Sequence, residues 1–230
     1  MAAPGSVMPI PSLARLTVAE LTALGLDVPL DAAGRPRNRY RFKRLYDTQT
    51  IATAAGTKTS MFNTTTSSRS AHARGLGGCN LQTAGQLDLN ADFFLLGLDL
   101  EYVIGIDGDD DVQDDVVKLN EYGFMEELRV NEQKVLDELF FSVMPANRGV
   151  SFDVTNAGKT TAAPLIDGAV NGRPGGSPGL ILPAASRIYI HHGEKIEAVC
   201  QHQAAAALAA ARTVRLSMIG IEIEGRSNAD

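Results

Sequence analysis

One alternating run of residues constrains the fold of this chain more than any other segment. Between Asp92 and Gly105, six consecutive alternate positions are apolar: Phe94, Leu96, Leu98, Leu100, Tyr102 and Ile104. A β-strand places successive side chains on opposite faces, whereas a helix, with a period of about 3.6 residues, cannot produce such a series. The run therefore predicts a long, half-buried β-strand that carries Asp99 and Glu101 on its other face.

Two further segments alternate in the same way, residues 194–203 and residues 213–224. In the second segment the apolar phase changes after Met218, and a phase change inside a strand predicts a β-bulge. Residues 130–140 and 204–211 predict short helices. Shorter candidate strands are residues 43–53, 57–63, 139–144, 149–154 and 186–191. About eight strands with few helices predict an all-β fold, a single eight-stranded jelly roll or β-sandwich with an N-terminal arm.

The length and composition of the chain agree with one such domain. The chain has 230 residues, of which 44% are hydrophobic and 21% charged, as is usual for a folded globular protein. We expect residues 1–40 to form a flexible N-terminal arm, residues 41–226 the jelly-roll domain and residues 227–230 a tail. The roughly 185 residues after the arm suffice for one jelly roll and are too few for two.

Cysteine content and hydropathy exclude two classes of protein. Cys79 and Cys200 are too few for a disulfide framework, and the sequence is compatible with two free thiols or with a single bridge. No apolar run approaches the roughly 20 residues of a membrane-spanning helix. Residues 1–15 also lack the basic start and apolar run of a secretory signal. We therefore expect neither a secreted mini-protein nor an integral membrane protein.

The arm contains a helix signal at about residues 17–25. Thr17 and Glu20 have the spacing of a capping box, and Leu21 and Leu24 give the helix an apolar face. A helix this short is not stable alone in water. It must therefore dock on its own domain or on a neighbouring chain.

A basic run follows this helix, with six of the chain's 21 basic side chains in residues 35–44. They are Arg35, Arg37, Arg39, Arg41, Lys43 and Arg44. The first four alternate, so an extended chain places them on one side. This charged face is either solvated and ion-paired within the fold, or it binds phosphates or an acidic patch on another copy. A localised basic run on a chain with a net charge of −6 favours a partner.

Residues 107–115 form the most acidic part of the chain. Aspartates at the first, third and fifth positions resemble the opening of a calcium-binding loop, but Val112 replaces the glycine and Lys118 the glutamate of an EF-hand. We favour a solvated acidic loop, which is also a candidate partner for the basic run within or between copies. A looser calcium site is the alternative, with the candidate ligands Asp107, Asp109, Asp111 and Asp114.

The sequence contains no motif that predicts an enzyme. Gly158-Lys159-Thr160 lacks the preceding glycine of a phosphate-binding loop, and no nucleophile motif occurs. His191, His192 and His202 have at most a faint likeness to a cupin-type metal site, and surface or half-buried histidines are the favoured interpretation. We expect no catalytic residues and no cofactor other than the calcium alternative.

Several short sequence segments occur in an order that is similar to that in a known family. They are RLYDTQTI at 44–51, TSMFN at 59–63, NLQTAGQL at 80–87, the strand at 93–104, LP at 182–183, GEKI at 193–196 and RLSMIG at 215–220. In this order they resemble the single jelly-roll capsid proteins of tailless, often membrane-containing, double-stranded DNA phages and related viruses. The resemblance extends over about residues 40–226.

The resemblance implies a structural virion protein, a capsid subunit that assembles with itself or with other capsid proteins into an icosahedral shell. It further implies synthesis in the host cytoplasm, location in the virion and no enzymatic activity. Leu21 and Leu24 would contact a neighbouring subunit, and the basic run would contact carboxylates, an internal membrane or nucleic acid. The alternatives are another virion component (a decoration, spike-base or tail β-sandwich protein) and a cupin-like metal-dependent or carbohydrate-active enzyme.

Overall fold

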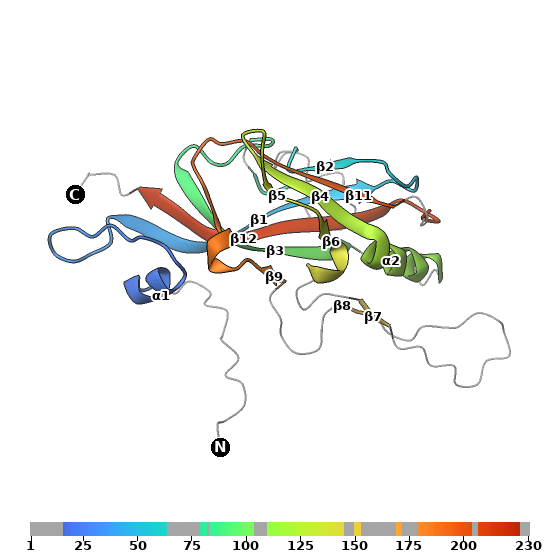
Figure 1. Ribbon diagram of the computed structural model, residues 1–230, viewed down its shortest axis with the longest axis horizontal. Helices are drawn as coiled ribbons and strands as arrows, with labels where there is room; N and C mark the ends of the chain where they lie inside the picture. Colours follow the sequence, from blue (N-terminus) through green and yellow to red (C-terminus); the bar gives the residue numbers. More distant parts are fainter. Residues whose placement is uncertain are drawn as a thin grey trace, which may run out of the picture.

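The fold is all-β, as the sequence predicts. A computed structural model describes residues 16–63, 79–81, 83–103, 110–144, 150–152, 169–171, 179–203 and 207–225. Strands account for most of the secondary structure in these residues, and the remaining elements are two α-helices and two short 3-10 helices. Two antiparallel sheets face each other in a sandwich-like arrangement (Figure 1).

The first sheet has the strand order β1-β12-β3-β10, with β9 beside β3, and the second has the order β2-β11-β4-β5, with β6 beside β4. The strands of the first sheet are β1 (Asn38–Ile51), β3 (Ala91–Val103), β9 (Leu180–Ile181), β10 (Ile188–Ile190) and β12 (Arg212–Gly225). Those of the second are β2 (Thr59–Met61), β4 (Gly123–Val130), β5 (Gln133–Leu136), β6 (Leu139–Phe140) and β11 (Ile196–His202). A separate pair consists of β7 (Val150–Phe152) and β8 (Ala169–Asn171).

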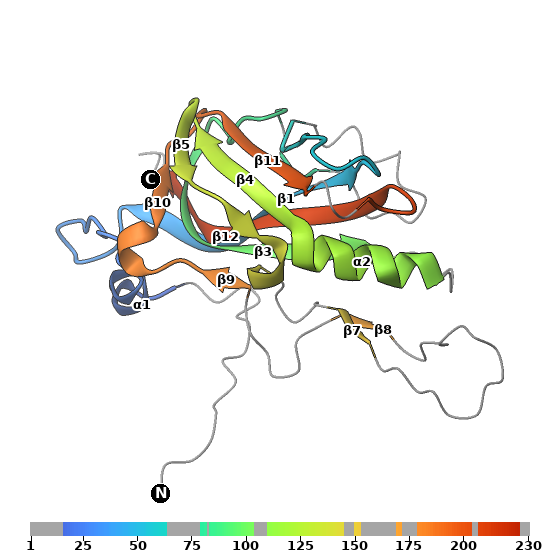
Figure 2. The same ribbon diagram turned by 45° about the vertical axis from the view of Figure 1, so that its right-hand side comes forward.

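The helices lie at the margins of the sandwich (Figure 2). They are α1 (Val18–Ala23), α2 (Asp110–Tyr122), η2 (Phe141–Val143) and η3 (Ala184–Ser186). The predicted strands at 194–203 and 213–224 are present as β11 and β12, and the five shorter candidate segments contain parts of β1, β2, β6, β7 and β10. The predicted segment 139–144 is a strand only over its first two residues, because η2 follows at once.

Apolar side chains fill the space between the two sheets, where burial of hydrocarbon provides the main driving force for folding. The first sheet contributes Leu45, Phe93, Leu95, Leu98, Leu100 and Leu216, and the second contributes Met61, Met125, Leu128, Ile196 and Ala198. Both cysteines lie in this core as free thiols. Burial raises the pKa of Cys200 to about 12, so this thiol has little thiolate character at neutral pH.

The long strand at 92–105 is confirmed as β3, but its six alternating apolar residues do not share one face. Phe94 and Leu96 point away from the second sheet, whereas Leu98, Leu100 and Tyr102 point into the core. The side chains change face because the register between β3 and β12 shifts by one residue at Leu96. Both faces are apolar in the first half of β3, so a period-two pattern alone could not locate the change.

At the position of the β-bulge predicted within residues 213–224, the register of β12 with β3 shifts between Ile219 and Gly220, but the bulged residue does not lie in β12. The extra residue belongs to β3, since β12 pairs with β1 without interruption from Arg212 to Gly225. The apolar phase of β12 changes for another reason. Ile221 and Ile223 face α1 on the outer side of the sheet, whereas Met218 faces the core.

The two predicted helices are wrong where the structure describes them. Residues 130–140 form the end of β4, a tight turn and β5, and the two turn residues Asn131 and Glu132 have φ of 50° and 68°. This left-handed pair matches the two-residue connections of β-hairpins. Residues 207–211 are not helical, and residues 204–206 lie outside the described part of the chain.

The predicted acidic loop contains a helix instead. In α2, Val116 and Leu119 are buried at a spacing of three residues, while Asp114, Val117 and Glu121 are exposed. This arrangement is that of an amphipathic helix packed on a core. Its many aspartates, which have low helix propensity, concealed the apolar spacing in the sequence.

Gly220 allows the close approach of β12 to β3, and its replacement tests this packing. A Cβ atom at Gly220 would meet the carbonyl oxygen of Phe94 and the ring of Phe93. We expect Gly220→Ala to lower the free energy of unfolding by about 2 kcal/mol. Gly225→Ala is the control, because no atom lies within 4 Å of a Cβ there. Urea unfolding measures both, and equal stability of the two variants would contradict the packing.

Candidate interaction surface

The outer face of the first sheet is divided into an apolar half and a polar half. The apolar half consists of Tyr40, Phe94, Leu96, Ile221 and Ile223. Helix α1 of the same chain covers it, with Leu21 fully buried and Leu16, Leu24 and Val28 partly buried. The helix therefore docks on its own domain, one of the two alternatives that the sequence leaves open.

The predicted capping box of α1 is confirmed. The Glu20 N–H donates to the Thr17 Oγ1 atom at 3.3 Å, and the Thr17 N–H donates to the Glu20 carboxylate at 2.7 Å. Gly25 follows the helix with a φ of 86°, and the Arg187 guanidinium donates to the Leu24 carbonyl oxygen. These bonds fix both ends of a helix of six residues. Contact of Leu21 and Leu24 with a neighbouring subunit stays a prediction.

The polar half of this face carries a network of charges on neighbouring strands. Arg44 on β1 forms an ion pair with the buried Asp99 on β3. On β12, the Arg215 guanidinium lies 3.4 Å from the Glu101 carboxylate and 4.8 Å from the centre of the Tyr46 ring. The positive and negative charges of this network balance, so it stabilises the sheet without creating a charged patch.

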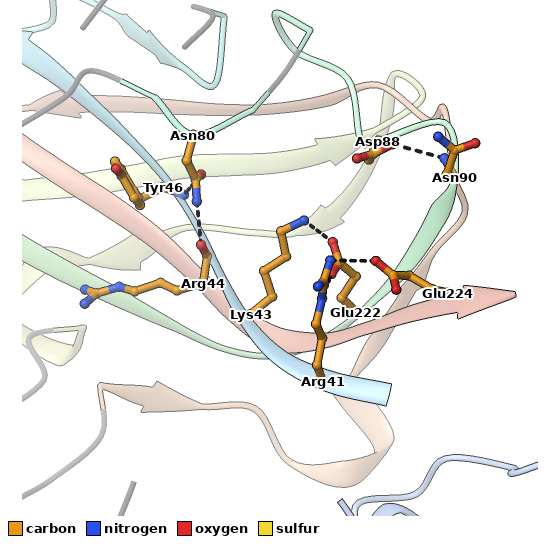
Figure 3. Close-up of polar contacts among 9 residues, drawn as sticks. All are labelled: Arg41, Lys43, Arg44, Tyr46, Asn80, Asp88, Asn90, Glu222 and Glu224. Carbon is orange, nitrogen blue, oxygen red and sulfur yellow. Dashed lines mark hydrogen bonds and ion pairs between the residues drawn. The ribbon is translucent and has the colours of Figure 1, made fainter. Parts of the chain in front are cut away.

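On the opposite side of β1, two members of the basic run form ion pairs within the fold (Figure 3). Arg41 and Lys43 both pair with Glu222, which is 3% exposed, and Arg41 also pairs with Glu224 at 2.6 Å. Hydrogen bonding to Glu222 raises the pKa of Arg41 above its ordinary value. A buried carboxylate needs such partners, since an unpaired buried charge is costly. These contacts support the interpretation of ion pairing within the fold for Arg41, Lys43 and Arg44.

The three remaining arginines of the run stay exposed. Arg35 and Arg37 lie in the loop before β1, where the Arg35 N–H donates to the Asp31 carboxylate at 2.8 Å. Arg37 Nε donates to the Leu30 carbonyl oxygen at 3.0 Å. Arg39 lies at the start of β1. Within the described ranges of the chain, none of these three guanidinium groups forms an ion pair.

Asn80 protects the free edge of β1, a role that no sequence pattern predicts. Its side-chain oxygen accepts from the Tyr46 N–H at 2.7 Å, and its amide nitrogen donates to the Arg44 carbonyl oxygen at 2.7 Å. The Asn80 N–H donates to the Tyr46 carbonyl oxygen at 3.1 Å. One side chain thus occupies edge groups that would otherwise pair with another strand.

The acidic segment is divided between structural and exposed carboxylates. Asp115 is buried and accepts from the N–H groups of Ala209 and Ala210, at 2.7 and 3.1 Å, and from Arg212 Nε at 2.7 Å. Asp114 is exposed and pairs with Lys118 at 2.6 Å. Asp115, which was not a predicted calcium ligand, therefore holds the segment before β12 against α2.

The structure does not bring the predicted calcium ligands together. Asp107 and Asp109 lie outside the described residues, and of Asp111 only the helical backbone is described. Asp114 is the one member of the set with a described side chain. A search of the described side chains found no group of three or more potential metal ligands.

The histidines also lie apart. His191 and His192 follow β10 in a turn and are exposed, and His192 Nδ1 lies 2.8 Å from the Asp92 carboxylate. His202 is buried at the end of β11, with Nε2 3.0 Å from the Ala52 carbonyl oxygen. His72 lies outside the described residues.

Comparison with known proteins provides no relative: no family model, no curated protein and no solved structure matches this chain. Among the described residues, no helix is long and apolar enough to cross a membrane. The interpretation of the surface therefore depends on its own geometry and charge.

Leu21 anchors α1 on the sheet, and two matched substitutions test this docking. We expect Leu21→Ala to lower the free energy of unfolding by about 3 kcal/mol, because it leaves a cavity against the apolar half of the sheet. Leu24→Ala should cost less than about 1.5 kcal/mol, since Leu24 is only partly buried. Thermal unfolding and amide exchange of residues 18–23 measure the effect. Equal losses for both variants would contradict the docking.

The Asp115 carboxylate makes stability depend on pH. Burial alone would raise its pKa, but the hydrogen bonds from Ala209, Ala210 and Arg212 lower the pKa below the ordinary value of 3.8. The carboxylate therefore stabilises the fold above that value, and this contribution is lost as pH falls through the lower pKa of the folded state.

We expect Asp115→Asn to lower the free energy of unfolding by about 3 kcal/mol at neutral pH, because Arg212 loses its buried partner. The difference from the wild type should shrink below about pH 4. Asp114→Asn is the control and should cost no more than about 0.5 kcal/mol, since its ion pair is exposed. Chemical unfolding over a pH series measures both, and a pH-independent loss for Asp115→Asn would contradict this role.

Proposed function

We propose that this chain is a structural virion protein, a capsid subunit built on a single jelly roll with an N-terminal arm. The subunit assembles with itself or with other capsid proteins into a closed shell. The observation that carries the proposal is the order of the strands in the two sheets.

The strand order supports a jelly roll. Eight strands, taken in chain order as β1, β2, β3, β4, β5, β10, β11 and β12, pass from one sheet to the other at every step except β4 to β5, so that β1-β12-β3-β10 faces β2-β11-β4-β5. This is the arrangement produced when an antiparallel ribbon of four strand pairs wraps around a barrel, as in two Greek keys. The strands β6 and β9 then extend the two sheets, and β7 and β8 form an excursion between β6 and β9.

The filled interior favours a structural role among the proteins that use this fold. Jelly rolls occur in capsids, lectins and cupins, and cupins place their metal ligands inside the barrel. Here Met61, Ile196, Ala198 and Cys200 face the interior, and each is buried in the apolar core. These four residues of β2 and β11 are therefore packing residues, and the buried His202 at the end of β11 contacts the Ala52 carbonyl oxygen.

The distribution of charge supports association through the N-terminal part of the chain. The fold neutralises Arg41, Lys43 and Arg44, which leaves Arg35, Arg37 and Arg39 exposed at one end. Exposed arginines suit carboxylates of another subunit, and equally phosphates of nucleic acid or of a membrane beneath the shell. The proposed partners of the chain are copies of itself and other capsid proteins, and its location is the virion.

Sedimentation of the purified full-length chain tests the proposal. We expect particles of many copies that form above a threshold concentration, because closed shells assemble cooperatively from weak contacts. A chain that stays monomeric over the whole accessible range, alone and with the other structural proteins of its virus, would contradict a capsid role. A stable complex of only a few copies would favour a spike-base or tail component instead.

A further inference from the structure

Exposed apolar side chains occur on α2 and on the two elements that pack against it, β6 and η2. Val117 and Tyr122 lie on α2, while Phe140 and Val143 come from β6 and η2, which pack against α2. Each of these four residues is between 37% and 46% exposed. Single exposed apolar residues are ordinary, but several on adjoining elements are typical of an interaction site. We call these four residues the α2 patch.

Helix α2 has an excess of negative charge. The sequence of α2 contains five acidic residues and one basic residue. Asp114 and Glu121 are exposed on the helix, and Glu138 is exposed just before β6. A partner that fits this surface must present apolar side chains among positive charges.

The other end of the same molecule has that composition. Leu30 and Phe42 are 42% and 43% exposed, and Arg35, Arg37 and Arg39 are exposed between them in sequence. We call these five residues the arginine end. Residues 30–42 contain four arginines and one acidic residue, Asp31, so this segment has an excess of positive charge, opposite to that of α2.

The two surfaces lie too far apart to meet within one copy. Figures 1 and 2 both show the loop that precedes β1 at one end of the molecule and α2 at the opposite end. Two like ends would repel each other, so a two-fold contact through either surface is disfavoured. A second copy, in contrast, can bring its arginine end to the α2 patch of the first. Such a head-to-tail contact repeats and closes when the rotation between copies allows it.

We propose that the α2 patch of one copy binds the arginine end of a second copy, as a lateral contact between neighbouring subunits. Leu30 and Phe42 pack on the apolar side chains of the patch, and Arg35 and Arg39 approach Asp114 and Glu121. This inference rests on the proposed function, since it names the surfaces through which subunits join. It also assigns the attraction between the basic run and the acidic segment to a contact between two copies.

Charge reversal at each end tests the contact. The arginine variant carries Arg35→Glu and Arg39→Glu, and the α2 variant carries Asp114→Lys and Glu121→Lys. Each variant alone presents like charges at both ends of the molecule. We expect each to need at least about a tenfold higher concentration for half-association than the wild type, as measured by sedimentation velocity.

Mixing provides the decisive arm of the experiment. An equimolar mixture of the two variants restores opposite charges at every head-to-tail contact. A chain with all four substitutions restores them as well. We expect both to associate within about threefold of the wild-type concentration. At about 500 mM salt the differences between wild type and variants should shrink, because screening weakens the charge pairs.

A matched control changes the same number of charges elsewhere. Lys134→Glu on β5 and Lys195→Glu just before β11 alter two exposed lysines, and association should stay close to that of the wild type. Melting temperatures near the wild-type value establish that all variants fold, since every substituted side chain is exposed.

The outcomes separate this inference from the proposed function. If the wild type forms particles and both reversed variants do so equally well, or if mixing fails to rescue them, the contact is wrong and the capsid role stands. If the wild type remains monomeric under all conditions, both are wrong. Loss of association in each variant with recovery in the mixture supports the contact.

Discussion

The continuous pairing of β12 with β1 on one side and β3 on the other is the interaction on which the rest of the structure depends. β12 pairs with β1 over fourteen residues, Arg212 to Gly225, and with β3 over nearly the same length. The sheet therefore extends beyond the area that the second sheet covers. Over one half of the first sheet, the inner side chains pack against the second sheet. Over the other half, apolar side chains on the outer face need a different element to cover them.

Helix α1 supplies that cover. Leu21 is fully buried among residues of β1, β3 and β12, so the N-terminal segment completes the fold. At the same end of the sheet, β1 and β12 carry Arg41, Lys43 and Glu222 on the opposite side, where the ion pairs replace apolar packing. The basic run is thus divided: three of its members form ion pairs within the sheet, and three remain exposed.

Much of the fold could be predicted from the sequence because strand alternation is a local signal. The long strands β3, β11 and β12 and the capping box at Thr17 were all visible in it. The face of each side chain in β3 was not, because a strand covered on both sides has no polar face to set the phase. The hairpin at Asn131 was missed because it lacks glycine, although its residues adopt left-handed conformations.

The candidate surface was less predictable, because it depends on which charges meet in space. The sequence shows six basic residues in one run but cannot show that Glu222, far along the chain, neutralises two of them. Likewise, Asp115 looked like one of many solvated aspartates until Ala209, Ala210 and Arg212 were placed around it. Among the described residues, the arginine end and the α2 patch stay exposed after such pairing, and they are the surfaces that we propose for assembly.

Electron microscopy of the purified full-length protein tests most directly the proposal that this chain is a subunit of a shell. We expect closed particles of uniform diameter whose walls consist of many copies of the chain. We also expect their formation to depend on salt concentration. Micrographs that show only dispersed monomers, at every salt concentration and with the partner virion proteins present, would contradict the proposal.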